Sequence, residues 1–199
     1  MELEDIILGG LEAIIPDYDD RGNYTKLYTI DGKIHKLYKS FWTVRNQICK
    51  HYLMDFKAAR KYFGEITFMK NLSPISFDGK DVFVYIKVRN PVSDNDGAHG
   101  LINTTYVEKV TEEDDEVIIK LQNNGKIKSL WTFKNTMKHI NIGNKLRKQY
   151  SGNLPLMGEN LDFNKKYNKP ITLGDIVFLM EKTLESLDGS IKDKFFPEH

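Results

Sequence analysis

The sequence predicts an α+β fold, with a mainly antiparallel β-sheet, interrupting helices and a C-terminal helical segment. Residues 24–30 alternate in character, and an Asp31-Gly32 turn leads into residues 33–39, where Ile34 and Leu37 are apolar, which is the pattern of a β-hairpin. The hydrophobic period lengthens to three and four residues after Ser40, as in an amphipathic helix. A second stripe with helical spacing covers residues 172–187. The chain has 199 residues, enough for one large or two small domains.

The N-terminal part is expected to begin with a short strand at residues 11–15, because Pro16 ends that apolar run. The acidic residues 17–22 then predict a loop that leads into the hairpin. A helix follows, for which Thr43 is the expected N-cap.

The helical pattern continues or restarts up to Gly64, which is the expected C-terminal stop. Apolar residues at helical spacing predict its inner face: Val44, Ile48, Tyr52, Leu53, Phe56, Ala59, Tyr62 and Phe63. The outer face carries almost only positive charge: Arg45, Lys50, Lys57, Arg60 and Lys61.

Beyond Gly64 the pattern returns to strands. They are expected at residues 66–69, 81–88, 101–110, 116–121 and 126–131. The composition of residues 90–100 predicts a loop, which is also the best candidate for a mobile or binding loop. An acidic turn at residues 112–116 and an Asn123-Asn124-Gly125 turn separate the last three strands.

A helix is expected at residues 134–150, with Phe133, Met137, Ile140 and Leu146 inward, although Gly143 lowers its helix propensity. Residues 151–170 predict a loop rich in Gly, Asn and Pro, and Thr172 caps the last helix. The apolar stripe of that helix is typical either of packing in a core or of an interface with another protein. We therefore divide the chain into a domain at residues 1–150 and a C-terminal loop and helix at residues 151–199, to which we assign a regulatory or assembly role.

Charge on this chain comes in blocks. The chain holds 29 Lys and Arg, 28 Asp and Glu and five His, for a net charge of +1. Residues 121–150 contain seven Lys or Arg and no carboxylate, and residues 23–70 contain ten basic and three acidic residues. A near-neutral protein can still present a basic face to a polyanion, because the local potential governs that encounter. Charge blocks are also common on solvated faces, so charge alone does not decide.

Sequence signatures of common enzymes are absent. The chain has no GxxxxGK[ST], GxGxxG, HExxH, GxSxG or CxxC pattern, and its five histidines lack metal-ligand spacing. Cys49 is the single cysteine, so it forms no intramolecular disulfide, and we expect it to be buried or inert. We therefore expect no enzyme, no metal and no cofactor. The remaining enzymatic alternative is a site at the loop of residues 90–100, beside His99.

We expect a cytoplasmic protein that does not interact with membranes. Residues 1–16 are acidic and lack the basic start of an export signal. No apolar run approaches the roughly 20 residues that a membrane-spanning helix requires.

Four collinear segments resemble the ComK-type competence transcription factors of low-GC Gram-positive bacteria. They are GLEAIIPDYDDRGNYTKLYTIDGK, ICKHYLMDFKAARKYFGEIT, KNLSPISFDGKDVFVYIKV and GAHGLINTTYVEKV. The most specific pieces are Cys49 within its helix, the Arg60-Lys61 pair in AARKYFGE, and residues 74–88. The next most specific pieces are the acidic loop and the NNGK turn, which lead to the basic stretch at residues 121–150. The resemblance covers residues 11–150.

This resemblance implies a transcription regulator that activates DNA-uptake genes by binding paired A·T-rich boxes, largely through the minor groove. It further implies DNA bending and a homo-oligomer, a dimer or tetramer. It also implies control by an adaptor and protease that bind a motif near the C-terminus, which Leu161-Asp162-Phe163 and Lys169-Pro170 match only in part. Lys and Arg would neutralise phosphates, and Asn and Gln also suit a narrow A·T-rich groove.

We accordingly predict two lines of contact with double-stranded DNA. The first is Arg45, Lys50, Lys57, Arg60 and Lys61, and the second is Lys134, Lys138, Lys145, Arg147 and Lys148. The alternative is a protein-interaction regulatory module without DNA binding, which would act through Leu179 and Leu184 of the last helix.

Overall fold

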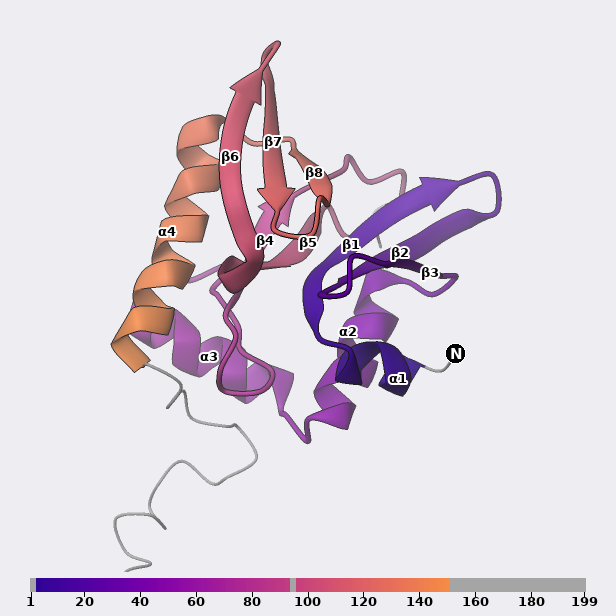
Figure 1. Cartoon of the computed structure of the whole chain (residues 1–199). Coiled ribbons are helices and arrows are strands. Elements are labelled where there is room, and N and C mark those ends of the chain that lie inside the picture. The colour runs from indigo at the N-terminus through magenta and orange to yellow at the C-terminus, as the bar shows by residue number, and fades with distance from the viewer. Residues whose placement is uncertain (1–2, 94–95, 151–199) are drawn as a thin grey trace, which may run out of the picture. The chain divides into compact units, whose positions relative to one another are not determined.

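The computed structural model of the chain describes residues 3–93 and 96–150, which all belong to one compact unit (Figure 1). The predicted loop at residues 151–170 and the predicted last helix lie outside the described residues. The α+β prediction is confirmed: helices alternate with antiparallel strands, which form a five-stranded and a three-stranded sheet.

The five-stranded sheet has the order β3-β2-β1-β5-β4. The strands are β1 (Leu11–Asp19), β2 (Gly22–Thr29), β3 (Ile34–Leu37), β4 (Phe83–Lys87) and β5 (His99–Asn103). The hairpin of β2 and β3 is confirmed, with Thr25 opposite Leu37 and Tyr28 opposite Ile34. The predicted strand at residues 81–88 is also confirmed, as β4.

The prediction of a loop at residues 17–22 is wrong, because β1 continues to Asp19 and pairs with β2. Two lysines on neighbouring strands neutralise its carboxylates. Lys26 Nζ lies 2.5 Å from Asp17, and Lys36 pairs with Asp19. A run that looks too acidic for a strand is thus balanced by lysines of β2 and β3, which the fold brings within ion-pair distance.

Three helices cover one face of this sheet: α1 (Leu3–Leu8), α2 (Phe41–His51) and α3 (Phe56–Thr67). Ser40, not the predicted Thr43, caps α2, because its Oγ accepts a hydrogen bond of 3.2 Å from the Thr43 amide. Leu53, predicted to face inward, is exposed in the link to α3, with a φ of 50°.

α3 does not stop at Gly64, and the predicted strand at residues 66–69 is therefore wrong. Ile66 completes the inner face of α3, because it lies one turn beyond the fully buried Phe63 and packs against the same core. The helix ends at Phe68, whose φ is 55°, and the Met69 amide donates to the Gly64 carbonyl at 3.0 Å.

The predicted strand at residues 101–110 is interrupted where the chain leaves one sheet for the other. Asn103 accepts a hydrogen bond from the Thr105 amide at 3.0 Å and begins the 3₁₀ turn η1 (Thr104–Tyr106). Its amide also donates to the Leu11 carbonyl at 3.0 Å, 92 residues away in sequence. The interruption therefore depends on a long-range contact.

The second sheet has the order β6-β7-β8. Its strands are β6 (Val107–Glu113), β7 (Glu116–Leu121) and β8 (Lys126–Ser129). The prediction of a strand at residues 116–121 is confirmed, and so is the turn at Asn124, whose φ is 65°. The acidic turn narrows to Asp114 and Asp115, because β6 extends to Glu113.

The helix predicted at residues 134–150 is confirmed as α4 (Phe133–Tyr150). Ile140 and Leu146 are buried as predicted, Met137 is half-buried, and Phe133 is exposed instead of buried. Gly143 allows the close approach of α4 to its neighbours. A Cβ at this position would lie 2.6 Å from methyl carbons of Val84 and Thr104.

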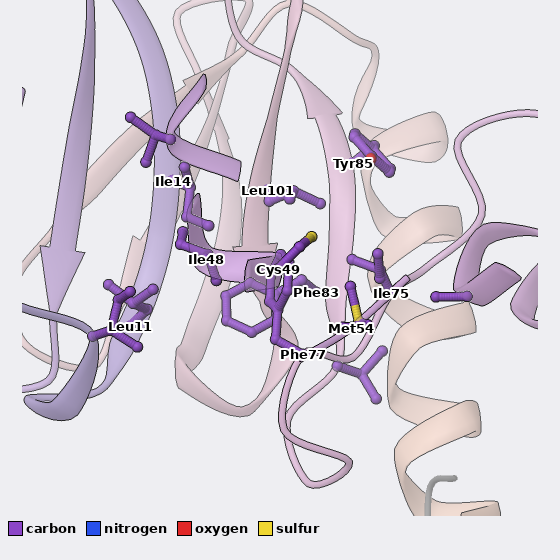
Figure 2. Packing of buried hydrophobic residues seen from close by; sticks show 14 of the residues in the cluster. Leu11, Ile14, Ile48, Cys49, Met54, Ile75, Phe77, Phe83, Tyr85 and Leu101 are labelled. Atoms are coloured by element: carbon purple, nitrogen blue, oxygen red, sulfur yellow. The ribbon is translucent and has the colours of Figure 1, made fainter. Parts of the chain in front are cut away.

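Two apolar clusters fill the two faces of the five-stranded sheet. One lies between the sheet and the helices α1 to α3, and Figure 2 shows Ile48, Cys49 and Met54 packed against Leu101 and Phe83 of the strands. The other lies between the opposite face, the three-stranded sheet and Ile140 of α4. Leu146, two turns further along α4, belongs to the first cluster together with Ala59 and Phe63 of α3.

Candidate nucleic-acid interface

The outer face of α3 holds a shallow basic groove. Its lining consists of Lys57, Arg60, Lys61, Gly64, Glu65, Phe68, Met69 and Lys70, and its volume is about 930 Å³. The structure thus brings together three of the five predicted residues of the first line, Lys57, Arg60 and Lys61. They are exposed, since Ala59 and Phe63 turn the opposite face of the helix into the core.

Gly64 forms the base of this groove. The chain turns back on itself after Phe68, and a Cβ on Gly64 would lie 2.9 Å from the Met69 carbonyl oxygen. Any other residue would therefore strain the turn and fill the space between the basic side chains. Asn71 accepts a hydrogen bond of 3.2 Å from the Arg60 guanidinium, which limits the freedom of this long side chain.

The structure places the other two predicted residues of the first line elsewhere. The Arg45 guanidinium is half-buried, 3.6 Å from the centre of the Phe56 ring and 4.7 Å from that of Trp42, so it joins α2 to α3. Lys50 is exposed, but it lines a different hollow of about 660 Å³ with residues of α1 and β3.

Burial raises the pKa of the Tyr85 hydroxyl on β4, and the positive charges of Arg45 and Arg60 act in the opposite direction. Both guanidinium groups therefore lie within electrostatic range of the same phenol. Arg45 is thus close to the groove of α3 without lining it.

Four lysines of the second predicted line form a stripe along α4. Lys134, Lys138, Lys145 and Lys148 are all exposed. At 3.6 residues per turn they fall within an arc of about 80°, opposite Gly143, and the stripe extends about 21 Å. We call these residues the lysine stripe.

Arg147 is not part of this stripe. It lies about 100° around the helix from Lys148 and is half-buried. Its Nε is buried and has no hydrogen-bond partner among the described residues. Its side chain is therefore oriented toward the protein.

The lysine stripe and the groove lie on helices that share a core. Figure 1 shows α3 next to the C-terminal end of α4, where Leu146 joins the cluster that holds Ala59 and Phe63. The groove, with three of the five residues of the first predicted line, and the lysine stripe are thus carried by two helices that meet at one end of α4.

Sequence reasoning missed the groove residues that follow α3. Phe68, Met69 and Lys70 line the groove, and Phe68 is 95% exposed. An aromatic residue with φ near 55° costs on the order of 1 kcal/mol relative to glycine. The sequence carries no signal for this conformation, since an apolar pair after a helix equally fits a strand.

Five lysines on or beside the strands form ion pairs with carboxylates, whereas Lys87, Lys109 and Lys126 of the strands form none in the described part of the chain. Lys26 pairs with Asp17, Lys33 with Asp31, Lys36 with Asp19, Lys120 with Glu113 and Lys128 with Glu116. Lysine hydrogen bonds correspondingly lower the pKa values of the Asp31 and Glu113 carboxyls. In the described part of the chain, no carboxylate forms an ion pair with Lys57, Lys61, Lys134, Lys138 or Lys145.

The loop proposed for the enzymatic alternative is anchored by Arg89, which is only 7% exposed. Its guanidinium donates to the carbonyls of Gly97 and Asp17 at 2.8 and 3.0 Å and lies over the Tyr18 ring. The Tyr18 hydroxyl donates to Asp96 at 2.6 Å. The same hydroxyl accepts a hydrogen bond of 3.0 Å from the Val92 amide, so both described ends of the loop, residues 90–93 and 96–98, are attached to the hairpin of β1 and β2.

His99 packs against the ring of Trp131, which also contacts His139. Burial lowers the pKa of His99 below its usual value and lowers that of His139 to about 4, so both rings are neutral near pH 7.

Burial also raises the pKa of the Cys49 thiol to about 11, and the prediction that Cys49 is buried is confirmed. Among the described residues, no group of three His, Cys, Asp or Glu could hold a metal ion.

Leu179 and Leu184, the residues of the interaction-module alternative, lie outside the described residues. Within residues 3–93 and 96–150, no helix has the length and apolarity that crossing a bilayer would need.

No protein-family model matches the chain, and neither does any curated protein or solved structure.

Proposed function

We propose that the chain is a DNA-binding transcription regulator of the competence type, which contacts duplex DNA through the groove of α3 and the lysine stripe of α4. The unequal distribution of ion pairs supports this proposal most strongly. Five lysines on or beside the sheets are paired with carboxylates, whereas Lys57, Lys61, Lys134, Lys138 and Lys145 of the two helices form no ion pair in the described part of the chain. A chain with a net charge of +1 can therefore carry a locally positive surface.

The position of Lys134 adds to this support. It lies in the first turn of α4, which contains no acidic residue, although the positive end of the helix dipole favours carboxylates there. A lysine at this position does not stabilise the helix. It does strengthen the positive potential that a phosphate backbone would meet.

The spacing of the charges fits an extended polyanion. The lysine stripe is straight, about 21 Å long and free of carboxylates, since α4 contains no Asp or Glu. The phosphates of one DNA strand recur about every 3.4 Å along the helix axis, so the stripe could contact several of them in succession. A compact small-molecule anion would use only one or two of these lysines.

The preference for A·T-rich boxes, the minor-groove approach, the activation of DNA-uptake genes and the homo-oligomer belong to the proposal through the family resemblance. The same holds for the cytoplasmic location and for control by an adaptor and protease. Groove width and deformability would then supply specificity, while the lysines would supply affinity that tolerates many sequences.

The proposal is tested by fluorescence anisotropy with the full chain and two labelled duplexes of equal length, one with two A·T-rich boxes and one G·C-rich. We expect both to bind, the A·T-rich duplex more tightly. With five or more phosphate contacts, the affinity should fall roughly 100-fold or more between 50 and 200 mM salt. Absence of binding at 50 mM salt would refute the proposal.

A further inference from the structure

The most unusual residue next to the basic groove is Phe68. Its side chain is 95% exposed, and its backbone adopts the left-handed conformation that normally favours glycine. The left-handed backbone ends α3, but glycine would adopt it with less strain, and the exposed ring buries almost no surface, so the aromatic side chain itself does not help the fold. An outlier of this kind beside a basic groove points to a role in the binding that we propose for that groove.

The surroundings of Phe68 indicate the chemistry of its ligand. The ring lines the same groove as Lys57, Arg60 and Lys61, with Lys70 two residues further along the chain. The groove holds these four cations and one carboxylate, Glu65, so a ligand that covers it must offer an apolar surface for the ring and negative charge beside it. Stacked bases between two phosphate backbones meet both requirements.

Among the described residues, the lining of the groove contains one aromatic ring, not a series. Proteins that bind single-stranded nucleic acid usually offer successive aromatic side chains, on which successive bases stack. A single projecting apolar side chain flanked by cations is instead the arrangement by which proteins enter a base step of a duplex from the minor groove.

We infer that Phe68 is an apolar wedge, which inserts between adjacent base pairs while the cations of the groove hold the flanking phosphates. This inference rests on the proposed DNA binding and adds to it a residue that contacts the bases. Pyrimidine–purine steps such as TA unstack most easily, so the wedge would favour a TA step within an A·T-rich box.

The test compares the full chain with the variants Phe68→Ala, Phe68→Gly and Leu53→Ala. Leu53 is a matched control, because it is also apolar, 81% exposed and left-handed, but it does not line the groove. The probe is a duplex that carries 2-aminopurine at the TA step, since the fluorescence of this base analogue rises when it is unstacked. Anisotropy of a labelled copy gives the affinity.

We expect the wild-type chain and Leu53→Ala to increase the 2-aminopurine fluorescence to the same extent. Phe68→Ala and Phe68→Gly should lose this increase and bind roughly 10-fold more weakly. Phe68→Gly should also unfold at a higher temperature than the wild type, because glycine relieves the strained backbone. A loss of signal in this variant therefore cannot result from unfolding.

Three results would overturn the inference. If both Phe68 variants unstack the probe as the wild type does, the wedge is wrong and DNA binding stands. If the wild type binds the single strand more tightly than the duplex, Phe68 is a stacking platform for single strands. If only self-association, measured by sedimentation, depends on Phe68, the ring belongs to an interface between copies. Absence of any DNA binding would instead refute the proposed function itself.

Discussion

Replacing Lys57, Arg60 and Lys61 together by alanine is expected to weaken binding to every duplex roughly 10- to 100-fold near 100 mM salt. Each of these cations is exposed, lines the groove and would neutralise one phosphate. Losing three such contacts should reduce the slope of log affinity against log salt by about 2 to 3. Replacing Lys134, Lys138 and Lys145 should have a similar effect, because the lysine stripe is equally exposed.

The matched control is the triple variant Lys33→Ala, Lys36→Ala and Lys120→Ala. It removes the same net charge, but from lysines that pair with Asp31, Asp19 and Glu113. We expect its affinity to stay within about threefold of the wild type, because local potential and not total charge governs binding. Equal losses in the control and in the α3 variant would show that only net charge matters.

Phe63→Ala is expected to have the largest effect on stability. Phe63 is fully buried and anchors α3 in the cluster beneath the sheet. Deleting a buried ring of this size costs about 3–5 kcal/mol, because transfer free energy is lost and a cavity remains. That is a large share of the 5–15 kcal/mol that stabilise a typical domain.

Urea unfolding followed by tryptophan fluorescence measures this loss, and Leu53→Ala again serves as the control. Leu53 is 81% exposed, so its truncation should change the free energy of unfolding by less than about 0.5 kcal/mol. A destabilisation by Phe63→Ala below about 1 kcal/mol would contradict the packing of α3 onto the sheet.

The elements that the sequence predicted correctly are those whose cause is local. β7 follows from alternation between two turns, and α4 follows from a long helical stripe. The missed features depend on distant partners. Asp17 and Asp19 look like part of a loop until the fold brings Lys26 and Lys36 into ion pairs with them, and Asn103 divides a predicted strand because it reaches Leu11.

The candidate site was predictable in part for the same reason. Helical periodicity alone groups Lys57, Lys61 and Arg60 on one face. The same periodicity separates Arg147 from Lys148, so the sequence already indicated that Arg147 is not part of the lysine stripe. It does not predict Phe68, because the left-handed turn that exposes this ring depends on Gly64 and Met69 folding back on each other.

The central claim is that the cations of α3 and α4, and not those of the sheets, contact DNA. Lysine acetylation read by mass spectrometry, with and without a saturating A·T-rich duplex, tests it most directly. We expect the duplex to protect Lys57, Lys61, Lys134, Lys138 and Lys145 and to leave the modification of Lys33 and Lys128 unchanged. Protection of the two sheet lysines, with the helix lysines still modified at their free rate, would contradict the claim.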